Sequence, residues 1–110
     1  MTEYLKTIKK ALEDKKSENI VIIDIHEISV MADYFVIASG SNVHQVQAMS
    51  DSVCDAMAKA GCHIRATEGY ESGNWILLDY GDIIVHLFDR ESRSFYDLER
   101  IWKDGKTVNL

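Results

Sequence analysis

The chain of 110 residues has no proline, only two cysteines and only six glycines. The cysteines, Cys54 and Cys62, are too few for the disulfide framework of a small secreted domain, so we expect two reduced thiols. The scarcity of proline and glycine, without any low-complexity stretch, excludes a disordered chain and favours a packed globular domain.

Basic residues and long hydrophobic runs are also scarce. The chain has 12 lysines and arginines against 18 aspartates and glutamates, a formal net charge of -6. Binding to naked nucleic acid needs clustered basic residues, so this balance argues against direct sequence-specific nucleic-acid binding and favours a basic protein partner. Residues 1–16 lack the apolar core of a signal peptide, and no run approaches a membrane span in length. We therefore expect a cytoplasmic protein with no membrane partner.

Hydrophobic residues make up 46% of the chain and follow the spacing of helices and strands. They predict a single α/β domain over residues 1–110 with the element order αββαβββα. The expected elements cover residues 3–16, 19–28, 33–40, 41–61, 62–69, 74–80, 82–88 and 94–105. A helix between strands in mid-chain implies one parallel pair with a right-handed crossover, and hairpins elsewhere make the five-stranded sheet mixed. One face of the last helix is expected to carry Phe95, Leu98, Ile101 and Trp102.

The stretch NWILLDYGDIIVHLFD, residues 74–89, places charged groups among very apolar residues. Side chains alternate across a sheet, so a turn at Tyr80–Gly81 or at Gly81–Asp82 divides the two strands into the same two faces. The expected core face consists of Ile76, Leu78, Tyr80, Ile83, Val85 and Leu87. The opposite face consists of Trp75, Leu77, Asp79, Asp82, Ile84 and His86. An aromatic ring, aliphatic groups and carboxylates on one face resemble a protein interface.

Two other interpretations of this second face stay open. Trp75, Leu77 and Ile84 can lie under a helix if the sheet is covered on both sides. Asp79 and His86 could contribute to a metal site with the nearby carboxylate of Asp82, but this spacing matches no recognised metal motif. We therefore predict no metal site, and we interpret His86 as a half-exposed strand residue.

The sequence ASGSNVHQ, residues 38–45, predicts a strand, a Gly-Ser turn and a helix N-terminus, an arrangement that can cradle a phosphate. A plainer interpretation is a capped helix after a tight turn, because Asn42 and Gln45 have the spacing of a capping box.

Nucleotidyltransferases combine such a turn with two metal-binding carboxylates one residue apart. That pair is missing here, since Asp51 and Asp55 are one helical turn apart and Asp79 and Asp82 flank a hairpin turn. No cysteine or serine has the local signature of a nucleophile either. We predict no catalytic residues, no enzymatic activity and no cofactor.

The segments MADYFVIASGSNVHQV, NWILLDYGDIIVHLF and FYDLERIW, in this order and spacing, resemble the ribosomal silencing factor family, also called Iojap-like or RsfS. The resemblance spans nearly the whole chain. It implies a small α/β domain related to the nucleotidyltransferase fold without its catalytic carboxylates. It also implies binding to the large ribosomal subunit through the fourteenth of its proteins, steric hindrance of small-subunit joining, and repression of translation when nutrients are scarce.

The resemblance places the partner-binding surface on the strand hairpin. It implies the positions Trp75, Leu77, Tyr80 and Asp82 first, and Asp79 and His86 second. Parity supports all of these except Tyr80, which it assigns to the core face, although the hydroxyl of a tyrosine at a turn can still reach solvent. Family members can pair with themselves, so a homodimer is compatible with this hypothesis. A nucleotidyltransferase-like enzyme and a self-assembly module are the competing classes.

Overall fold

The computed structural model describes residues 2–110 apart from the side chain of Ile101, so the predicted packing of Ile101 lies outside the described residues. The elements follow in the order α1 (Thr2–Asp14), β1 (Glu18–Asp24), β2 (Tyr34–Gly40), α2 (Val43–Lys59), β3 (Ala66–Glu68), β4 (Trp75–Asp79), β5 (Ile83–Asp89), α3 (Arg90–Tyr96), α4 (Leu98–Ile101) and β6 (Lys106–Thr107). The predicted α/β order is confirmed up to the last helix, which is divided in two and followed by a short strand.

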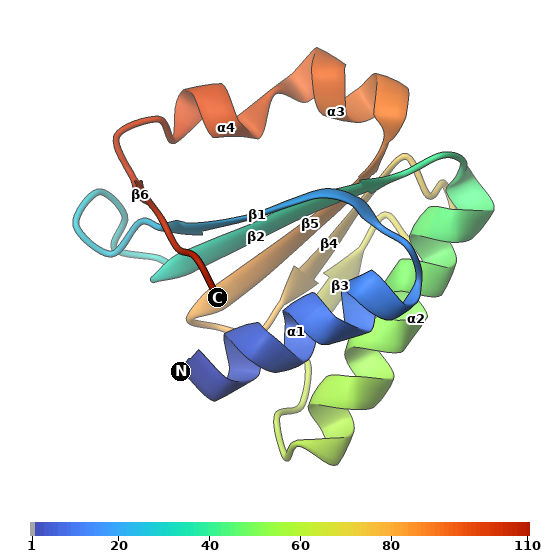
Figure 1. The fold of residues 1–110 in the computed structure, drawn as a ribbon, viewed down its shortest axis with the longest axis horizontal. Coiled ribbons are helices and arrows are strands. Elements are labelled where there is room, and N and C mark those ends of the chain that lie inside the picture. The colour runs from blue at the N-terminus through green and yellow to red at the C-terminus, as the bar shows by residue number, and fades with distance from the viewer. Residues whose placement is uncertain (1) are drawn as a thin grey trace.

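The strands form one mixed sheet in the order β3-β4-β5-β2-β1-β6 (Figure 1). The prediction of five strands is wrong, because the sheet has six. The additional strand, β6, is two exposed residues that pair with the end of β1, and it has no hydrophobic alternation by which the sequence could reveal it.

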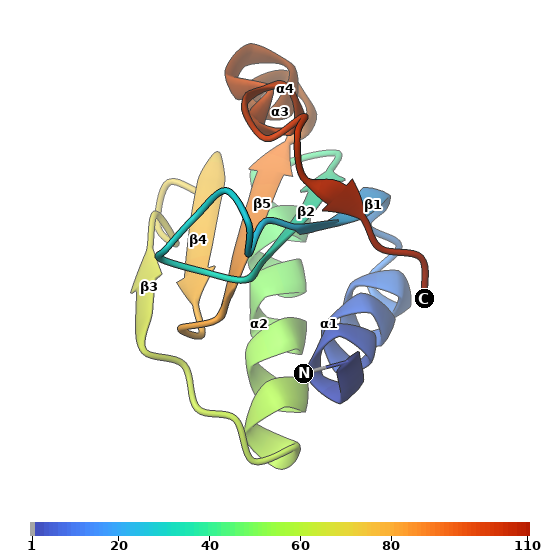
Figure 2. The same ribbon diagram turned by 90° about the vertical axis from the view of Figure 1, so that its left-hand side faces the viewer.

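A single neighbouring pair in this sheet, β2 and β5, is parallel. One parallel pair exists, as predicted, but the pairing expected across α2 is wrong. The strand after α2, β3, pairs antiparallel with β4, and β2 pairs in parallel with β5 instead. The meander β3-β4-β5 folds back so that its last strand lies beside β2. The hairpin of β4 and β5 consequently lies in one half of the sheet, and β3 forms the outer edge of that half (Figure 2).

The two long helices cover one face of the sheet, on the side opposite α3 and α4 (Figure 1). Helix α1 turns Leu5, Ile8, Ala11 and Leu12 inward, and α2 turns Val46, Met49, Val53 and Met57 inward. These side chains pack on the strand residues Ile22, Val36, Ala38, Ile76, Leu78, Ile83, Val85 and Leu87. The predicted core face of the hairpin is therefore confirmed. No helix within residues 2–110 is long and apolar enough to cross a membrane.

The C-terminal helix is interrupted at Asp97, whose backbone adopts a left-handed conformation with φ 47°. A second helix, α4, begins directly after it. Because of this break, side chains of α3 and α4 no longer follow one helical repeat and do not share one face. Leu98 is buried and Trp102 is half-buried on the sheet, but Phe95 remains 79% exposed. The expectation that Phe95 shares one helix face with Leu98 and Trp102 is therefore wrong, because the predicted continuous helix does not exist.

Candidate partner-binding face

A tight turn sets the register of the hairpin formed by β4 and β5. The Tyr80 N–H donates to the Ile83 carbonyl at 2.9 Å, which leaves Gly81 and Asp82 as the two turn residues. Gly81 has φ 86°, a conformation that favours glycine, and the hairpin turn with glycine at its first position matches the twist of the strands. The turn at Gly81–Asp82 is thus the second of the two predicted alternatives.

This register brings the predicted residues onto one side of the sheet. Leu77 pairs with His86, and Asp79 pairs with Ile84. Trp75, which precedes them on the same face of β4, is half-buried, as are Leu77, Asp79 and Ile84. The predicted division of side chains by parity is confirmed for these strand residues. We call this side of β4 and β5 the hairpin face.

Aromatic rings pack beside one another on the hairpin face. The Trp75 ring lies 4.6 Å from the Tyr96 ring of α3 and 5.2 Å from the Phe88 ring, measured between centroids. The His86 ring lies 4.5 Å from the Phe35 ring of β2 in an edge-to-face arrangement. Packing of this kind holds the rings in fixed positions, and aromatic residues are enriched among those that dominate protein interfaces.

The structure contradicts the expectation that His86 is half-exposed. His86 is only 4% exposed, because Phe35 and Trp75 flank its ring. The Trp75 indole Nε1–H donates a hydrogen bond to His86 Nδ1 at 3.1 Å. Since an indole N–H can only donate, Nδ1 must carry a lone pair, and the proton of neutral His86 lies on Nε2. Nε2 is buried and has no hydrogen-bond partner among the described residues.

Burial lowers the pKa of His86 to about 4 in the folded protein. The unfolded chain has the ordinary value of 6.5, so between these two values the unfolded state binds more protons than the folded state. The stabilisation associated with neutral His86 is therefore present above pH 6.5 and is lost as the pH falls towards 4.

We expect the free energy of unfolding to fall by about 1 to 2 kcal/mol more in the native protein than in a His86→Phe variant when the pH decreases from roughly 6.5 to 5. Urea denaturation at a series of pH values measures this difference. The comparison with the variant removes the contribution of carboxylates, which titrate in both proteins. Equal slopes in the two proteins would show that His86 is not held neutral by its surroundings.

Tyr80 does not reach solvent from the turn. The residue is 9% exposed and packs in the core under α2, with Cys54 and Cys62 against the same cluster. Its hydroxyl oxygen is buried and has no hydrogen-bond partner among the described residues. Burial raises the pKa of the Tyr80 phenol, and the neighbouring Cys54 thiol acts in the same direction. The expectation that its hydroxyl is accessible is therefore wrong, and parity assigns Tyr80 correctly to the core.

The two carboxylates of the hairpin have different surroundings. The half-buried Asp79 accepts a hydrogen bond from the Gly81 N–H at 2.7 Å, which stabilises the turn. Asp82 is exposed at the turn itself. Within residues 2–110, no three His, Cys, Asp or Glu side chains are placed so that they could hold a metal ion.

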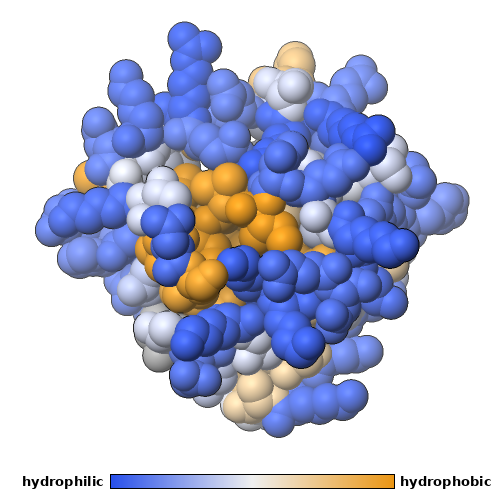
Figure 3. Space-filling model, in the orientation of Figure 1, coloured by the Kyte–Doolittle hydropathy of each residue, from blue (hydrophilic) through white to orange (hydrophobic). Residues whose placement is uncertain are grey.

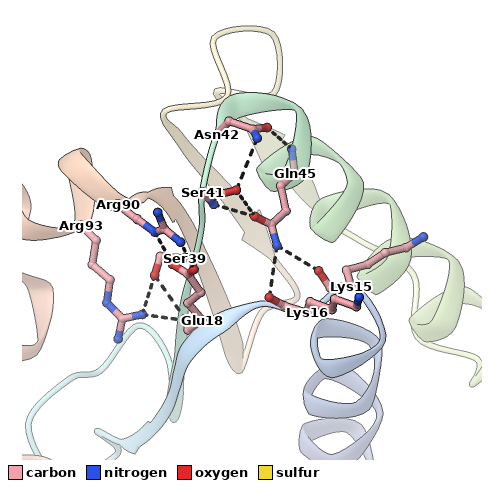
Figure 4. Close-up of polar contacts among 9 residues, drawn as sticks. All are labelled: Lys15, Lys16, Glu18, Ser39, Ser41, Asn42, Gln45, Arg90 and Arg93. Atoms are coloured by element: carbon pink, nitrogen blue, oxygen red, sulfur yellow. Dashed lines mark hydrogen bonds and ion pairs between the residues drawn. The ribbon is translucent and has the colours of Figure 1, made fainter.

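The Gly-Ser turn before α2 is already occupied by the protein's own side chains. Asn42 caps α2 by accepting from the Gln45 N–H at 2.9 Å, and Gln45 Oε1 accepts from the Ser41 N–H at 2.6 Å (Figure 4). The Gln45 amide also donates to the carbonyls of Lys15 and Lys16 at the end of α1. The N–H groups of Ser41 and Gln45 are thus engaged by the protein's own side chains, as the capped-helix interpretation predicts, and the Gln45 amide connects α2 to the end of α1.

A polar pocket of about 440 Å³ lies beside the carboxyl ends of β2 and β5. Its arginines are neutralised by acidic neighbours: Arg90 forms an ion pair with Glu18, and Arg93 forms one with Glu99 (Figure 4 shows the Glu18 contacts). Arg93 also donates to the Glu18 carbonyl and to Ser39 Oγ. These contacts join β1, β2 and α3, and they leave no excess of positive charge for an anionic ligand.

An apolar area on another side of the molecule lies where β1, β6 and the C-terminal segment meet (Figure 3). A shallow pocket of about 170 Å³ there includes Ile20, Val108 and Leu110. Lys9 of α1 closes one side of it by donating to the Leu110 carbonyl at 2.7 Å. This area belongs to the packing of the C-terminal segment on α1 and β1.

Several residues that contact or flank the hairpin face were missed by sequence reasoning. Phe35 and Tyr96 come from β2 and α3, and their contacts with His86 and Trp75 arise only when these elements are packed. Exposed apolar residues also border this face: Phe95 at one end, and Val30 and Met31 in the loop between β1 and β2. The local signal available was the short apolar pair Val30–Met31 inside a polar link.

The fold and this face together define a small α/β protein whose mixed sheet has one side buried by two helices and an aromatic, half-open opposite side. Residues 1–110 match the family model described as ribosomal silencing factor during starvation, RsfS. The chain therefore belongs to the RsfS family.

Curated relatives and solved structures agree with this membership. The chain is 39% identical over 108 residues to the ribosomal silencing factor RsfS of Halalkalibacterium halodurans, covering 98% of this chain and 92% of that protein. It is 38% identical to the RsfS of Bacillus subtilis, covering 96% of this chain and 90% of the relative. A crystal structure from Chromobacterium violaceum superposes with a TM-score of 0.91 at 34% identity, covering 100% of this chain and 91% of that one.

Proposed function

We propose that residues 1–110 form one ribosomal silencing factor domain that binds the large ribosomal subunit and blocks joining of the small subunit. The immediate partner is a basic protein at the subunit interface, the fourteenth protein of the large subunit, and the consequence is lower translation under nutrient limitation. Family membership is the observation that carries this proposal. The proposal includes a location in the cytoplasm, because ribosomes act there.

The chemistry of the hairpin face supports a protein partner. Trp75 and Leu77 are half-buried, so each has apolar surface left for a second molecule, and Asp82 is exposed in the turn that ends the same hairpin. A partner with basic residues around an apolar centre would complement both features. The net charge of -6 favours approach to such a protein and disfavours nonspecific binding to ribosomal RNA. Asp79, Tyr80 and His86 would act indirectly, by stabilising the turn and positioning Trp75.

The proposed mechanism is steric and requires no catalysis. Asn42 caps α2 after the Gly-Ser turn, and Gln45 accepts a hydrogen bond from the Ser41 N–H in that turn. The carboxylates of Asp51 and Asp55 are exposed on α2 and do not form a pair on a strand. A relation to the nucleotidyltransferase fold is therefore proposed without its chemistry, its metal ions or a cofactor. We expect nucleotide and Mg²⁺ to leave the melting temperature unchanged.

Co-sedimentation with purified ribosomal subunits tests the proposed function. We expect the protein to sediment with large subunits and not with small subunits, and to reduce formation of the joined ribosome when small subunits are added. Protein that stays in the supernatant with saturating large subunits would contradict the proposal. Binding without any effect on joining would retain the partner but contradict steric occlusion as the mechanism.

A further inference from the structure

We propose that the β1–β2 loop, residues 25–33, is a second arm of the partner-binding face, with Val30 and Met31 inserted into an apolar recess of the same basic partner. This inference rests on the proposed function and extends its site beyond the hairpin. It is carried by the exposure of the two side chains, by the attachment of the loop to the hairpin, and by the charges around it.

Val30 and Met31 are the most exposed large apolar residues described, at 105% and 87% of full exposure. Ile28 in the same loop is 42% exposed. Three exposed apolar side chains within four residues gain nothing from burial in the free protein, and such clusters are typical of interaction sites.

The loop is attached to the hairpin at its base. The N–H groups of Asp33 and Tyr34 both donate to the Asp82 carbonyl in the hairpin turn, at 2.8 and 3.0 Å. In Figure 1 the loop lies beyond the ends of β1 and β2, at the same end of the sheet as the turn between β4 and β5. The loop ends, Ile25 and Ala32, are buried in the same cluster as residues of the hairpin face. The base of the loop is therefore joined to the turn end of the hairpin.

Internal hydrogen bonds give the loop a defined shape before it meets a partner. The Ile25 N–H donates to the Asp33 carbonyl at 2.8 Å, and the Ile28 and Ser29 N–H groups donate to the Ile25 carbonyl. The Met31 N–H donates to Ser29 Oγ at 3.1 Å. An apolar tip on a structured loop loses little conformational entropy on binding, which favours affinity.

The charges around the loop favour a basic occupant over a second copy of this chain. Asp24, Glu27 and Asp33 lie in or beside the loop, and the exposed Asp82 lies in the hairpin turn that the base of the loop contacts. Lys106 lies 3.9 Å from Glu27, and His26 hydrogen-bonds to Asp24, which raises the pKa of the histidine. These two pairs leave Asp33 and Asp82, so the surroundings of the loop keep an excess of acidic charge. A second copy carries the same net charge of -6 and would add like charges.

The apolar contact is tested by replacing the tip with serine. We expect Val30→Ser/Met31→Ser to weaken binding to large subunits roughly tenfold, with an unchanged melting temperature because neither side chain is packed. Leu110→Ser is the matched control, since it removes an exposed apolar side chain from the opposite side of the molecule and should leave binding unchanged. Loss of binding with a lowered melting temperature would instead indicate that the tip supports the fold, and would overturn the proposal.

Substitutions of opposite charge at Met31 identify the partner's chemistry. Met31→Arg should weaken binding more than Met31→Glu, because the partner is basic. If the native protein binds large subunits and all loop variants bind equally, this inference fails while the proposed function stands; if the native protein does not bind, the proposed function itself fails. Self-association that the loop variants abolish would identify a second copy as the occupant and overturn the proposal.

Discussion

Trp75→Ala should weaken binding to the large ribosomal subunit by about 2 kcal/mol or more, which is roughly thirtyfold in Kd. Trp75 has the largest side chain of the hairpin face, and Tyr96 and Phe88 hold its ring in place. Its truncation would remove the apolar centre of the proposed interface. It would also leave His86 Nδ1 without the donor that now lies at 3.1 Å. Sedimentation with purified large subunits at graded concentrations measures the loss.

Because Trp75 is half-buried, its replacement should also lower the free energy of unfolding by about 1 to 2 kcal/mol. Two variants separate binding from folding. Trp75→Phe keeps an aromatic ring without the N–H and should retain part of the affinity. Asp82→Lys lies at the exposed turn, so it should slow association with a basic partner without changing the melting temperature. A folded Trp75→Ala protein with native affinity would show that the interface lies on another face.

Leu78→Ala should lower the free energy of unfolding by about 3 kcal/mol and the melting temperature by roughly 10 °C. Leu78 is fully buried between the sheet and α2, where truncation leaves a cavity that neighbouring side chains cannot fill completely. Chemical denaturation and thermal unfolding measure both quantities.

Leu77→Ala is the matched control for this change, since the same substitution is made one residue away on the opposite face. Leu77 is half-buried and pairs with His86, so its truncation should cost less stability and should weaken subunit binding. Leu78→Ala is thus expected to reduce mainly stability, and Leu77→Ala mainly subunit binding. If Leu77→Ala destabilises the protein as much as Leu78→Ala and leaves binding intact, the hairpin face is a second core surface.

Local patterns in the sequence were sufficient for most of the fold. The 3.6-residue spacing of apolar residues predicts α1 and α2, and Asn42 with Gln45 predicts the start of α2. The interruption at Asp97 could not be predicted, because a left-handed backbone at a non-glycine residue depends on how the flanking helices pack on the sheet. The two-residue strand β6 likewise exists only because the C-terminal segment passes the free edge of β1.

Which side chains share a face of the hairpin was determined by the sequence alone, because alternation along a strand is a local property that a two-residue turn preserves. How deeply each of them is buried was decided only by the tertiary structure. His86 is buried because Phe35 of β2, about fifty residues earlier in the chain, packs against its ring, and because Trp75 contacts it and donates a hydrogen bond to Nδ1. Burial depends on such contacts between elements distant in sequence, which no local pattern encodes.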